Sequence, residues 1–155
     1  VKEGASWVLG EDVGVHGWLE NIGYLSQNPF LFLGTVRDNF TFRVKGRTVD
    51  EALFWDIAKR LGLIEVLGEN PLDFELNEGG SNLSGGQQQR LALLRALQLD
   101  VPILMLDEAT SALDHASRDV VFSLLRERAE RGGMVIIITH DRELAGACDE
   151  VLKLD

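Results

Sequence analysis

The sequence predicts an α/β fold, in which a mostly parallel sheet carries flanking helices and an inserted helical subdomain. Apolar runs of strand length recur along the chain, and each leads into polar side chains, as buried parallel strands do. An amphipathic stretch separates two of these runs, and strands that alternate with helices are typical of parallel sheets. The middle of the chain, roughly Thr35–Ser84, shows helical patterns only. It therefore predicts an all-helical insertion in the α/β core.

The predicted strands occur at three places in the core and at the end of the chain. Ile22–Ser26 is an apolar run that leads directly to Gln27. Val101–Glu108 contains four consecutive apolar residues and ends in two carboxylates, which fits a strand buried on both faces. Met134–Asp141 is predicted to be another buried parallel strand. A last strand is expected at Glu150–Leu154.

Two amphipathic segments are predicted to form helices. Val49–Leu61 places leucine and isoleucine on one face, with Thr48 as a plausible N-cap and a glutamate at the capping-box spacing. Ala116–Arg131 also has an apolar face, and Asp114 is a natural N-cap for it. Two consecutive glycines, Gly132 and Gly133, are expected to end this helix.

The composition excludes several classes of protein. The chain has 155 residues, of which 45% are hydrophobic and 26% are charged, as in a globular domain with a core. A formal net charge of −10 without a basic cluster argues against nucleic acid or an anionic lipid surface as a direct ligand. A single cysteine excludes an internal disulfide and a cysteine-based metal site. The apolar runs are too short to span a bilayer, so we expect membrane association only through a partner.

The segment Leu83–Gln87 opens the most informative helix of the sequence. Ser84 is a good N-cap, and Gly85 and Gly86 let a ligand approach the backbone closely. A helix N-terminus with bare N–H groups and a hydroxyl is an anion site. Ser-Gly-Gly alone is more often an ordinary capped turn, but chance gives the full five-residue string in only about one of several thousand such chains.

This signature segment, Leu83–Gln87, resembles the signature motif of ABC-type ATPases, which binds the terminal phosphate of an ATP held by a partner domain. The resemblance implies that Ser84, Gly85, Gly86 and Gln87 close over that nucleotide. It also implies the P-loop NTPase-like version of the α/β fold.

Two segments before and within the helical middle resemble parts of ABC exporters. Gln27–Phe40 looks like the Q-loop segment, where a neutral amide at a strand end can reach a metal or its attacking water without adding charge. Within it, Phe30–Phe32 suits an apolar groove for a partner helix, although a core-facing aromatic cluster is the alternative. Leu76–Asn82 resembles the exporter X-loop in part. The resemblance implies that Phe30–Phe32 and Glu78 contact transmembrane helices; by itself, Glu78 would more often be a solvated charge.

The acidic strand Val101–Glu108 resembles a Walker B strand. Adjacent strand residues point to opposite sides, so its two acids need not have the same function. The resemblance implies that Asp107 helps to hold Mg²⁺, usually through water, and that Gln27 senses the metal and the water. It further implies that Glu108 polarises the attacking water as the catalytic base. Without the signature segment, a solvated pair of acids would be equally plausible.

Two later features complete the same order of motifs. Ala109–Asp114 resembles the D-loop, which crosses to the partner's site, so Asp114 is a candidate for nucleotide binding as well as for capping. His140 looks like the switch histidine, whose imidazole can donate a hydrogen bond to the γ-phosphate. A lone histidine at a strand end is otherwise usually a hydrogen-bonded surface residue.

The phosphate-cradling loop G-x-x-x-x-G-K-[ST], which an ATPase of this type needs, is not found among the 155 residues. In the family this loop precedes the Q-loop. We therefore expect residues 1–155 to be a partial ABC-type ATPase domain that lacks its N-terminal part. Its expected parts are a Q-loop side of the core (1–34), a helical subdomain with the signature segment (35–98) and the remaining core (99–155). These residues alone are expected to be inactive.

The resemblance implies an ATPase subunit or domain, dependent on ATP and Mg²⁺, that powers export at the cytoplasmic face of a membrane. Its implied partners are a second nucleotide-binding domain, identical or different, and transmembrane domains. Two alternatives remain open. One is a soluble ABC-type ATPase of DNA repair or translation, and the other is a non-catalytic module that completes a partner's ATP site.

Overall fold

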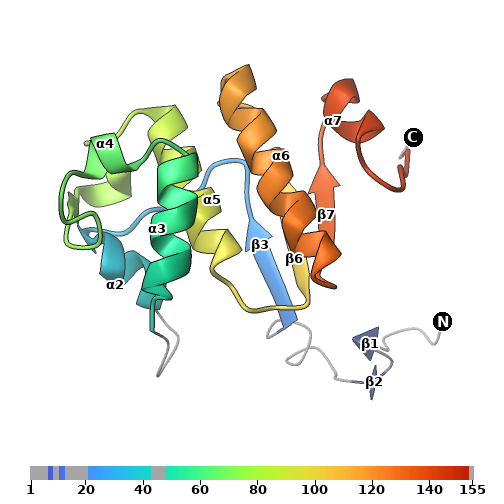
Figure 1. The fold of residues 1–155 in the computed structure, drawn as a ribbon, viewed down its shortest axis with the longest axis horizontal. Coiled ribbons are helices and arrows are strands. Elements are labelled where there is room, and N and C mark those ends of the chain that lie inside the picture. The colour runs from blue at the N-terminus through green and yellow to red at the C-terminus, as the bar shows by residue number, and fades with distance from the viewer. Residues whose placement is uncertain (1–6, 9–10, 13–20, 43–47, 154–155) are drawn as a thin grey trace.

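The computed structural model describes residues 7–8, 11–12, 21–42 and 48–153, and their fold is α/β, as predicted (Figure 1). The strands are β1 (Trp7–Val8), β2 (Glu11–Asp12), β3 (Ile22–Leu25), β4 (Gly34–Thr35), β5 (Glu75–Leu76), β6 (Ile103–Asp107) and β7 (Met134–Ile138). The α-helices are α2 (Val36–Thr41), α3 (Glu51–Arg60), α4 (Ile64–Leu67), α5 (Gly85–Leu97), α6 (His115–Glu130) and α7 (Arg142–Gly146). Within these ranges, every helix is too short or too polar to cross a bilayer.

A parallel sheet in the order β3–β6–β7 forms the centre of the described chain. In its register Tyr24 lies beside Met105, and Met105 lies beside Ile136. All three strands run in the same direction, so their carboxyl ends meet at one edge, the upper edge in Figure 1. This edge is where ligands bind in open α/β sheets, and it brings together the polar residues that follow the three strands.

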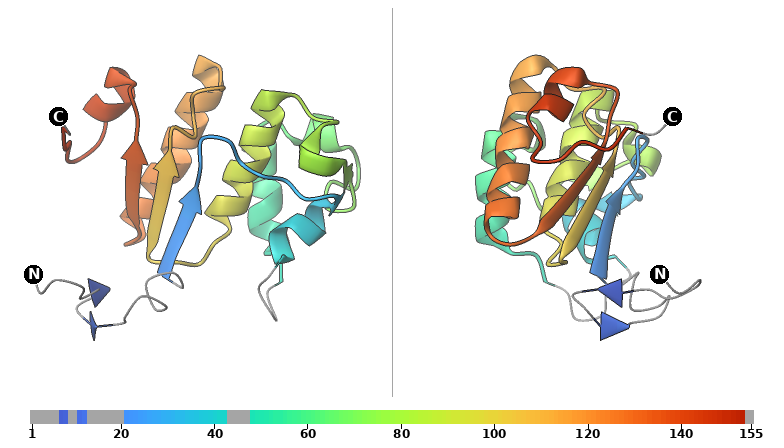
Figure 2. Two further views of the ribbon diagram at one scale, coloured as in Figure 1. Left: turned by 180° about the vertical axis from the view of Figure 1, so that it is seen from behind. Right: turned by 90° about the vertical axis from the view of Figure 1, so that its right-hand side faces the viewer.

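Helices pack against one face of this sheet, which carries alternate residues such as Leu25, Leu104 and Leu106 (Figure 2). Side chains on the other face remain accessible; Tyr24 is 55% exposed and Ile138 is 46% exposed. The expectation that β6 and β7 are buried on both faces is therefore wrong for the described residues. The apolar sequence of such a strand did not reveal that only alternate residues meet a helix.

The middle segment is mostly helical, but not entirely. β4 and β5 form a short antiparallel ladder, in which Gly34 pairs with Leu76, and a 3₁₀ turn follows at Glu78–Gly80. The predicted helix after Thr48 is α3, and its N-cap is Asp50, whose side chain accepts a hydrogen bond from the N–H of Leu53. Thr48 lies two residues too early to cap it.

Helix α5 links the middle segment to the sheet, since it packs against both α3 and β3. It begins at Gly85 as predicted, and its buried side chains include Leu91 and Leu94. Arg95 of α5 also donates a hydrogen bond to the Phe30 carbonyl at 2.9 Å. A single rigid helix therefore carries the signature segment at one end and holds the Q-loop segment near the other.

Helix α6 follows the D-loop segment, Ala109–Asp114, and has Asp114 as its N-cap, as predicted. It ends before Gly132, which has a φ of 93°, a conformation that favours glycine. The strand predicted at the end of the chain is not formed over 150–153, and Leu154 lies outside the described residues. The chain instead turns through α7, which is capped by Asp141.

Candidate functional site

Asp107 is the last residue of β6 and lies at the carboxyl edge of the sheet. Its Oδ2 atom accepts a hydrogen bond from the hydroxyl of Tyr24 at 3.0 Å. Tyr24 and Asp107 lie on the same face of neighbouring strands, because Tyr24 pairs with Met105, two residues before Asp107. The hydrogen bond to Asp107 raises the pKa of Tyr24, so the phenol stays a donor and orients the carboxylate.

Glu108 is held in an unusual backbone conformation next to Asp107. Its φ is 46°, the left-handed region that residues other than glycine rarely occupy. The N–H of Glu108 donates to the Ile138 carbonyl at 2.9 Å, and its own carbonyl accepts from the N–H of Ser111 at 3.1 Å. These two bonds fix the turn that brings the Glu108 side chain out of the strand. Backbone strain of this kind is concentrated at functional sites.

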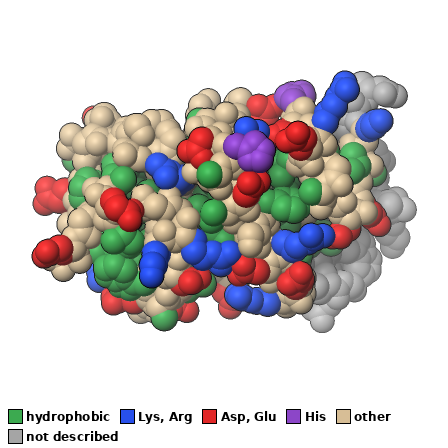
Figure 3. All heavy atoms as spheres, turned by 45° about the horizontal axis from the view of Figure 1, so that its top comes forward, with side chains coloured by type: hydrophobic (Ala, Val, Ile, Leu, Met, Phe, Trp, Pro, Cys, Tyr) green, Lys and Arg blue, Asp and Glu red, His purple; other side chains and the backbone are tan. Residues whose placement is uncertain are grey.

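The Glu108 carboxylate lies between two polar side chains from distant parts of the sequence. Oε2 accepts a hydrogen bond from Nε2 of Gln27 at 3.0 Å, and Oε1 lies 2.9 Å from Nε2 of His140. Glu108 is only 24% exposed at its side chain, whereas His140 is 94% exposed. Figure 3 looks onto this edge, where histidine and acidic side chains lie side by side. The structure therefore brings together all three residues that we predicted to be catalytic.

The oxygen atoms at this edge fit a magnesium ion in part. The Asp107 carboxylate and the Gln27 amide oxygen are ligands of the kind that Mg²⁺ prefers, and Gln27 uses its nitrogen, not its oxygen, toward Glu108. The described residues contain no group of three or more histidine, cysteine or acidic side chains that could hold a metal ion by themselves. Such a partial set suits Mg²⁺, which is usually bound by one or two carboxylates together with phosphate oxygens and water.

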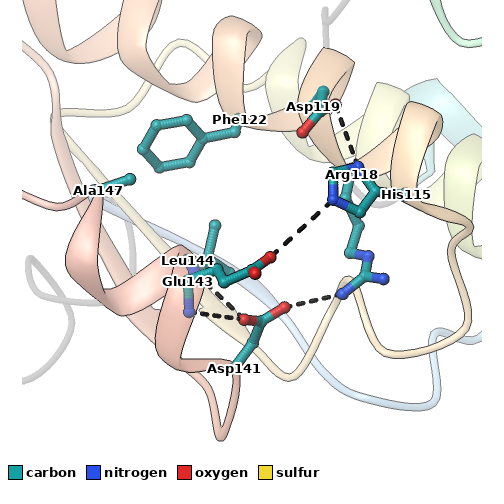
Figure 4. A pocket seen from close by; sticks show the side chains of 8 residues that line it. All are labelled: His115, Arg118, Asp119, Phe122, Asp141, Glu143, Leu144 and Ala147. Carbon is teal, nitrogen blue, oxygen red and sulfur yellow. Dashed lines mark hydrogen bonds and ion pairs between the residues drawn. The ribbon is translucent and has the colours of Figure 1, made fainter.

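An ion pair between α6 and the loop after β7 involves Asp141, the residue that follows His140. Arg118 donates from Nη1 to Oδ2 of Asp141 at 2.8 Å, as Figure 4 shows. Asp141 also accepts the N–H groups of Leu144 and Glu143 and caps α7; these backbone bonds, with Arg118, lower its pKa. Asp141 is therefore fixed by α6 and by α7, and this restricts the backbone of its neighbour His140.

The tip of the signature segment is open to solvent. Ser84 and Gly85 are exposed, and a Cβ placed on Gly85 would meet no other atom within 4 Å. Ser84 forms a capping box with Gln87: the Ser84 hydroxyl accepts the Gln87 N–H at 3.3 Å, and the Gln87 side chain accepts the Ser84 N–H at 2.8 Å. The first N–H groups of α5 have no carbonyl of their own helix to bond.

The signature tip is not joined to the cluster around Glu108 within the chain. Among the described residues, no hydrogen bond or ion pair connects Ser84, Gly85, Gly86 or Gln87 to Gln27, Glu108 or His140. The Asp114 carboxylate is engaged elsewhere: it accepts hydrogen bonds from the backbone N–H of Ser117 at 2.8 Å and from the Ser117 hydroxyl at 3.2 Å. These bonds lower the pKa of Asp114.

The Q-loop segment does not present all of Phe30–Phe32 to a partner. Leu31 is fully buried in the core, whereas Phe30 is 58% exposed and Leu33 is 74% exposed. The buried Asn39 fixes this arrangement, because its side chain accepts the Phe32 N–H and donates to the Phe32 carbonyl. The predicted contact surface is therefore corrected. Leu31 is part of the core, and Phe30 and Leu33 form the accessible apolar patch.

Glu78 is exposed on its 3₁₀ turn, close to the same loop. Two residues later, a Cβ placed on Gly80 would come 2.7 Å from Cδ1 of Leu31. Gly80 also has a φ of 68°, so a glycine is needed there on both counts. The X-loop segment, Leu76–Asn82, is thereby packed directly against the Q-loop segment.

Sequence reasoning did not identify Tyr24 or Arg118 as parts of the site. Tyr24 lies between two buried residues of β3, Gly23 and Leu25, and the two-residue period of a strand places its side chain on the opposite face. No sequence pattern indicates that Arg118 reaches Asp141, because that contact depends on how α6 and α7 pack.

Comparison with known proteins identifies relatives over most of the chain. The family model described as "ABC transporter" matches residues 2–111. The lactococcin-G-processing and transport ATP-binding protein LagD of Lactococcus lactis subsp. lactis is 37% identical over 147 residues, which are 94% of this chain and 20% of that protein. An ATP-dependent lipid A-core flippase of Mannheimia succiniciproducens is 39% identical over 133 residues, 84% of this chain and 22% of the flippase.

A solved structure shows the same relationship. The structure of a bacterial Atm1-family ABC exporter with ATP bound matches with a TM-score of 0.77 and 29% identity, and the match covers 90% of this chain and 25% of that chain. The chain thus spans a quarter or less of the length of these proteins. The match over residues 2–111, the related sequences and the shared fold agree, and the chain belongs to the ABC transporter family.

Proposed function

We propose that this chain is part of an ATP-hydrolysing domain that powers export across a membrane. The observation that carries the proposal is the position of Glu108 between the Gln27 amide and the His140 imidazole, at the carboxyl edge of a parallel sheet. The relatives are named as a transport protein, a flippase and an exporter, and these names favour export over DNA repair or translation.

In this proposal Glu108 is the general base. Gln27 and His140 each contact one carboxylate oxygen, and the fixed turn at Glu108 holds the side chain, which is 24% exposed, between them. A carboxylate positioned in this way can accept a proton from an attacking water. Because His140 is almost fully exposed, its imidazole can rotate from Glu108 to donate a hydrogen bond to a terminal phosphate oxygen.

The other site residues hold the metal and the charge of the nucleotide. When bound, Mg²⁺ neutralises negative charge on the phosphate oxygens. Asp107, oriented by Tyr24, and the amide oxygen of Gln27 would hold this ion. The open N-terminus of α5, with Ser84, Gly85 and Gly86, offers N–H groups and a positive helix end to a phosphate.

The proposed partners follow from what is exposed. Because Ser84 and Gly85 are exposed and, among the described residues, no hydrogen bond or ion pair joins Ser84–Gln87 to Glu108, we propose that this tip closes over nucleotide on a second domain, and that Asp114 faces the same interface. Phe30, Leu33 and Glu78 form the proposed contact with transmembrane domains, since large exposed apolar side chains on one loop mark an interaction surface. The domain is then held at the cytoplasmic face of a membrane through that partner.

Replacing Glu108 by glutamine in the complete ATPase domain that carries this chain tests the proposal. We expect Glu108→Gln to lower the rate of ATP hydrolysis by about 10²-fold or more, because an amide cannot accept the proton, while ATP binding persists. Glu130→Gln, a matched change at an exposed position of α6, should behave like the wild type. Unchanged hydrolysis in Glu108→Gln would exclude Glu108 as the base.

The same assay distinguishes the non-catalytic alternative. If the chain only completes a partner's site, the complete wild-type domain would hydrolyse no ATP by itself, and neither would its Glu108→Gln variant. The wild-type domain would raise hydrolysis only after mixing with a different nucleotide-binding domain.

A further inference from the structure

A buried glutamine joins the signature helix to the D-loop segment. Gln89 lies in the second turn of α5, and its side chain is only 3% exposed. Its Oε1 atom accepts a hydrogen bond from the backbone N–H of Ala112 at 3.0 Å, across 23 residues of sequence. A buried polar group without a partner is strongly unfavourable, so this contact fixes both ends of the hydrogen bond.

The same residue of the D-loop segment contacts α5 a second time. A Cβ placed on Gly86 would lie 3.4 Å from the carbonyl oxygen of Ala112. The first turns of α5 therefore lie against both the N–H and the carbonyl of Ala112. On its other side the loop is tied to the catalytic strand end, because the N–H of Ser111 donates to the Glu108 carbonyl at 3.1 Å.

We infer that Gln89 is a positioning residue, which holds the D-loop segment at a fixed place relative to the signature segment. The inference rests on the proposed function, in which both segments reach toward nucleotide on a partner domain. Gln89 is buried and cannot touch a nucleotide, so it acts through Ala112. When this contact is lost, the two segments no longer approach the partner's site as one unit, and reacting groups that are misplaced by small distances lose rate.

Methionine at position 89 tests the inference, because it matches glutamine in length and lacks the acceptor. In the complete domain, we expect Gln89→Met to speed amide hydrogen exchange at Ala112 about tenfold, the equivalent of one net hydrogen bond. We expect kcat for ATP hydrolysis to fall about tenfold with KM for ATP within about twofold, since the substitution replaces no group that contacts nucleotide in the proposed site.

A matched change near the other end of α5 serves as the control. Gln98 is the C-cap of α5, at the end opposite to the signature segment, and it bonds the backbone of Asp50 through Oε1 at 3.2 Å and Nε2 at 2.9 Å. Gln98→Met should leave exchange at Ala112 and kcat within about twofold of the wild type. If both variants changed kcat alike, the effect would come from α5 stability, and the inference would be wrong.

Two further measurements keep the outcomes separate. If Glu108→Gln stays active, the proposed function fails; if Glu108→Gln is inactive while Gln89→Met matches the wild type in exchange and kcat, only the inference fails. Should Gln89→Met not fold, exchange in the wild type decides. Slow exchange at the Ala112 amide relative to the amide of Ala116, an exposed residue in the first turn of α6, supports the inference, and equal rates overturn it.

Discussion

The signature tip and the cluster around Glu108 are built in opposite ways. At the tip, Ser84 and Gln87 satisfy each other's backbone groups three residues apart. In the cluster, Glu108 has Gln27 and His140 as partners, which lie in the loops after β3 and β7. A local arrangement forms wherever its few residues occur, whereas the cluster exists only when three strands are in register. The tip should therefore tolerate changes in the core that disperse the cluster.

The largest expected effect comes from removing the partners of Glu108. We expect His140→Ala or Gln27→Ala to lower ATP hydrolysis by about 10²-fold or more, because each change frees one oxygen of Glu108, the proposed base, from its fixed position. Both side chains are on the surface, and His140 is 94% exposed, so the unfolding temperature should hardly change. Parallel measurement of turnover and thermal unfolding checks this; a loss of turnover that only follows lost stability would contradict it.

A pair of leucines in the Q-loop segment tests how the cluster depends on the core. Leu31 is fully buried, and Leu31→Ala should lower the free energy of unfolding by about 2–5 kcal/mol, because it leaves a cavity under the loop that carries Gln27. Leu33 is 74% exposed, and Leu33→Ala should change that free energy by less than about 0.5 kcal/mol. Urea unfolding of both variants measures the difference, and equal losses would contradict the assignment of Leu31 to the core.

The two leucines also show where sequence reasoning succeeds and where it stops. The pattern Phe30–Leu33 is apolar throughout, and nothing local distinguishes the buried leucine from the exposed one. The distinction comes from Asn39, which hydrogen-bonds the backbone of Phe32, and from Gly80, whose missing side chain leaves room for Leu31. Asn39 and Gly80 belong to other elements of the fold, so the sequence of the loop alone does not predict which leucine is buried.

Elements with a local signal were predicted well. Ser84 and Asp114 cap their helices because a short polar side chain can reach the N–H three residues later, and both appear as expected. The cap at Asp50 was missed, since Thr48 satisfied the same local rule two residues earlier. The meeting of Gln27, Glu108 and His140 was predicted from the order of family motifs and the rule for parallel sheets, not from any spacing between them.

The cap at Ser84 allows its structural and chemical parts to be separated. Ser84→Ala should lower the free energy of unfolding by about 1 kcal/mol, whereas Ser84→Gly should lower it by only a few tenths, because glycine is itself an acceptable N-cap. If the hydroxyl also meets a phosphate, both variants should lose ATP turnover alike, despite their different stabilities. Chemical unfolding and ATP turnover, measured on both variants, check this. Full turnover in the glycine variant would show that Ser84 only caps the helix and does not contact a phosphate.

The smallest expected effect concerns Asp141, which combines a local cap with a distant ion pair. Its pKa is lowered chiefly by the N–H groups of Leu144 and Glu143, and then by Arg118. A carboxylate whose folded pKa lies below its ordinary value of about 3.9 stabilises the fold above that pH, and this stabilisation disappears as the pH falls through the folded pKa. Asp141→Asn keeps a capping oxygen but cannot titrate. We therefore expect the wild type to lose more unfolding free energy than Asp141→Asn between about pH 6 and pH 3.

Arg118→Met divides that pH dependence between the two kinds of contact. Because the backbone N–H groups are the main cause of the shift, the variant should keep most of the wild-type slope of unfolding free energy against pH. Urea unfolding at several pH values measures it. If Arg118→Met instead lowers the slope as much as Asp141→Asn does, the distant ion pair controls Asp141, and the loop that follows His140 belongs with the non-local cluster rather than with the locally built caps.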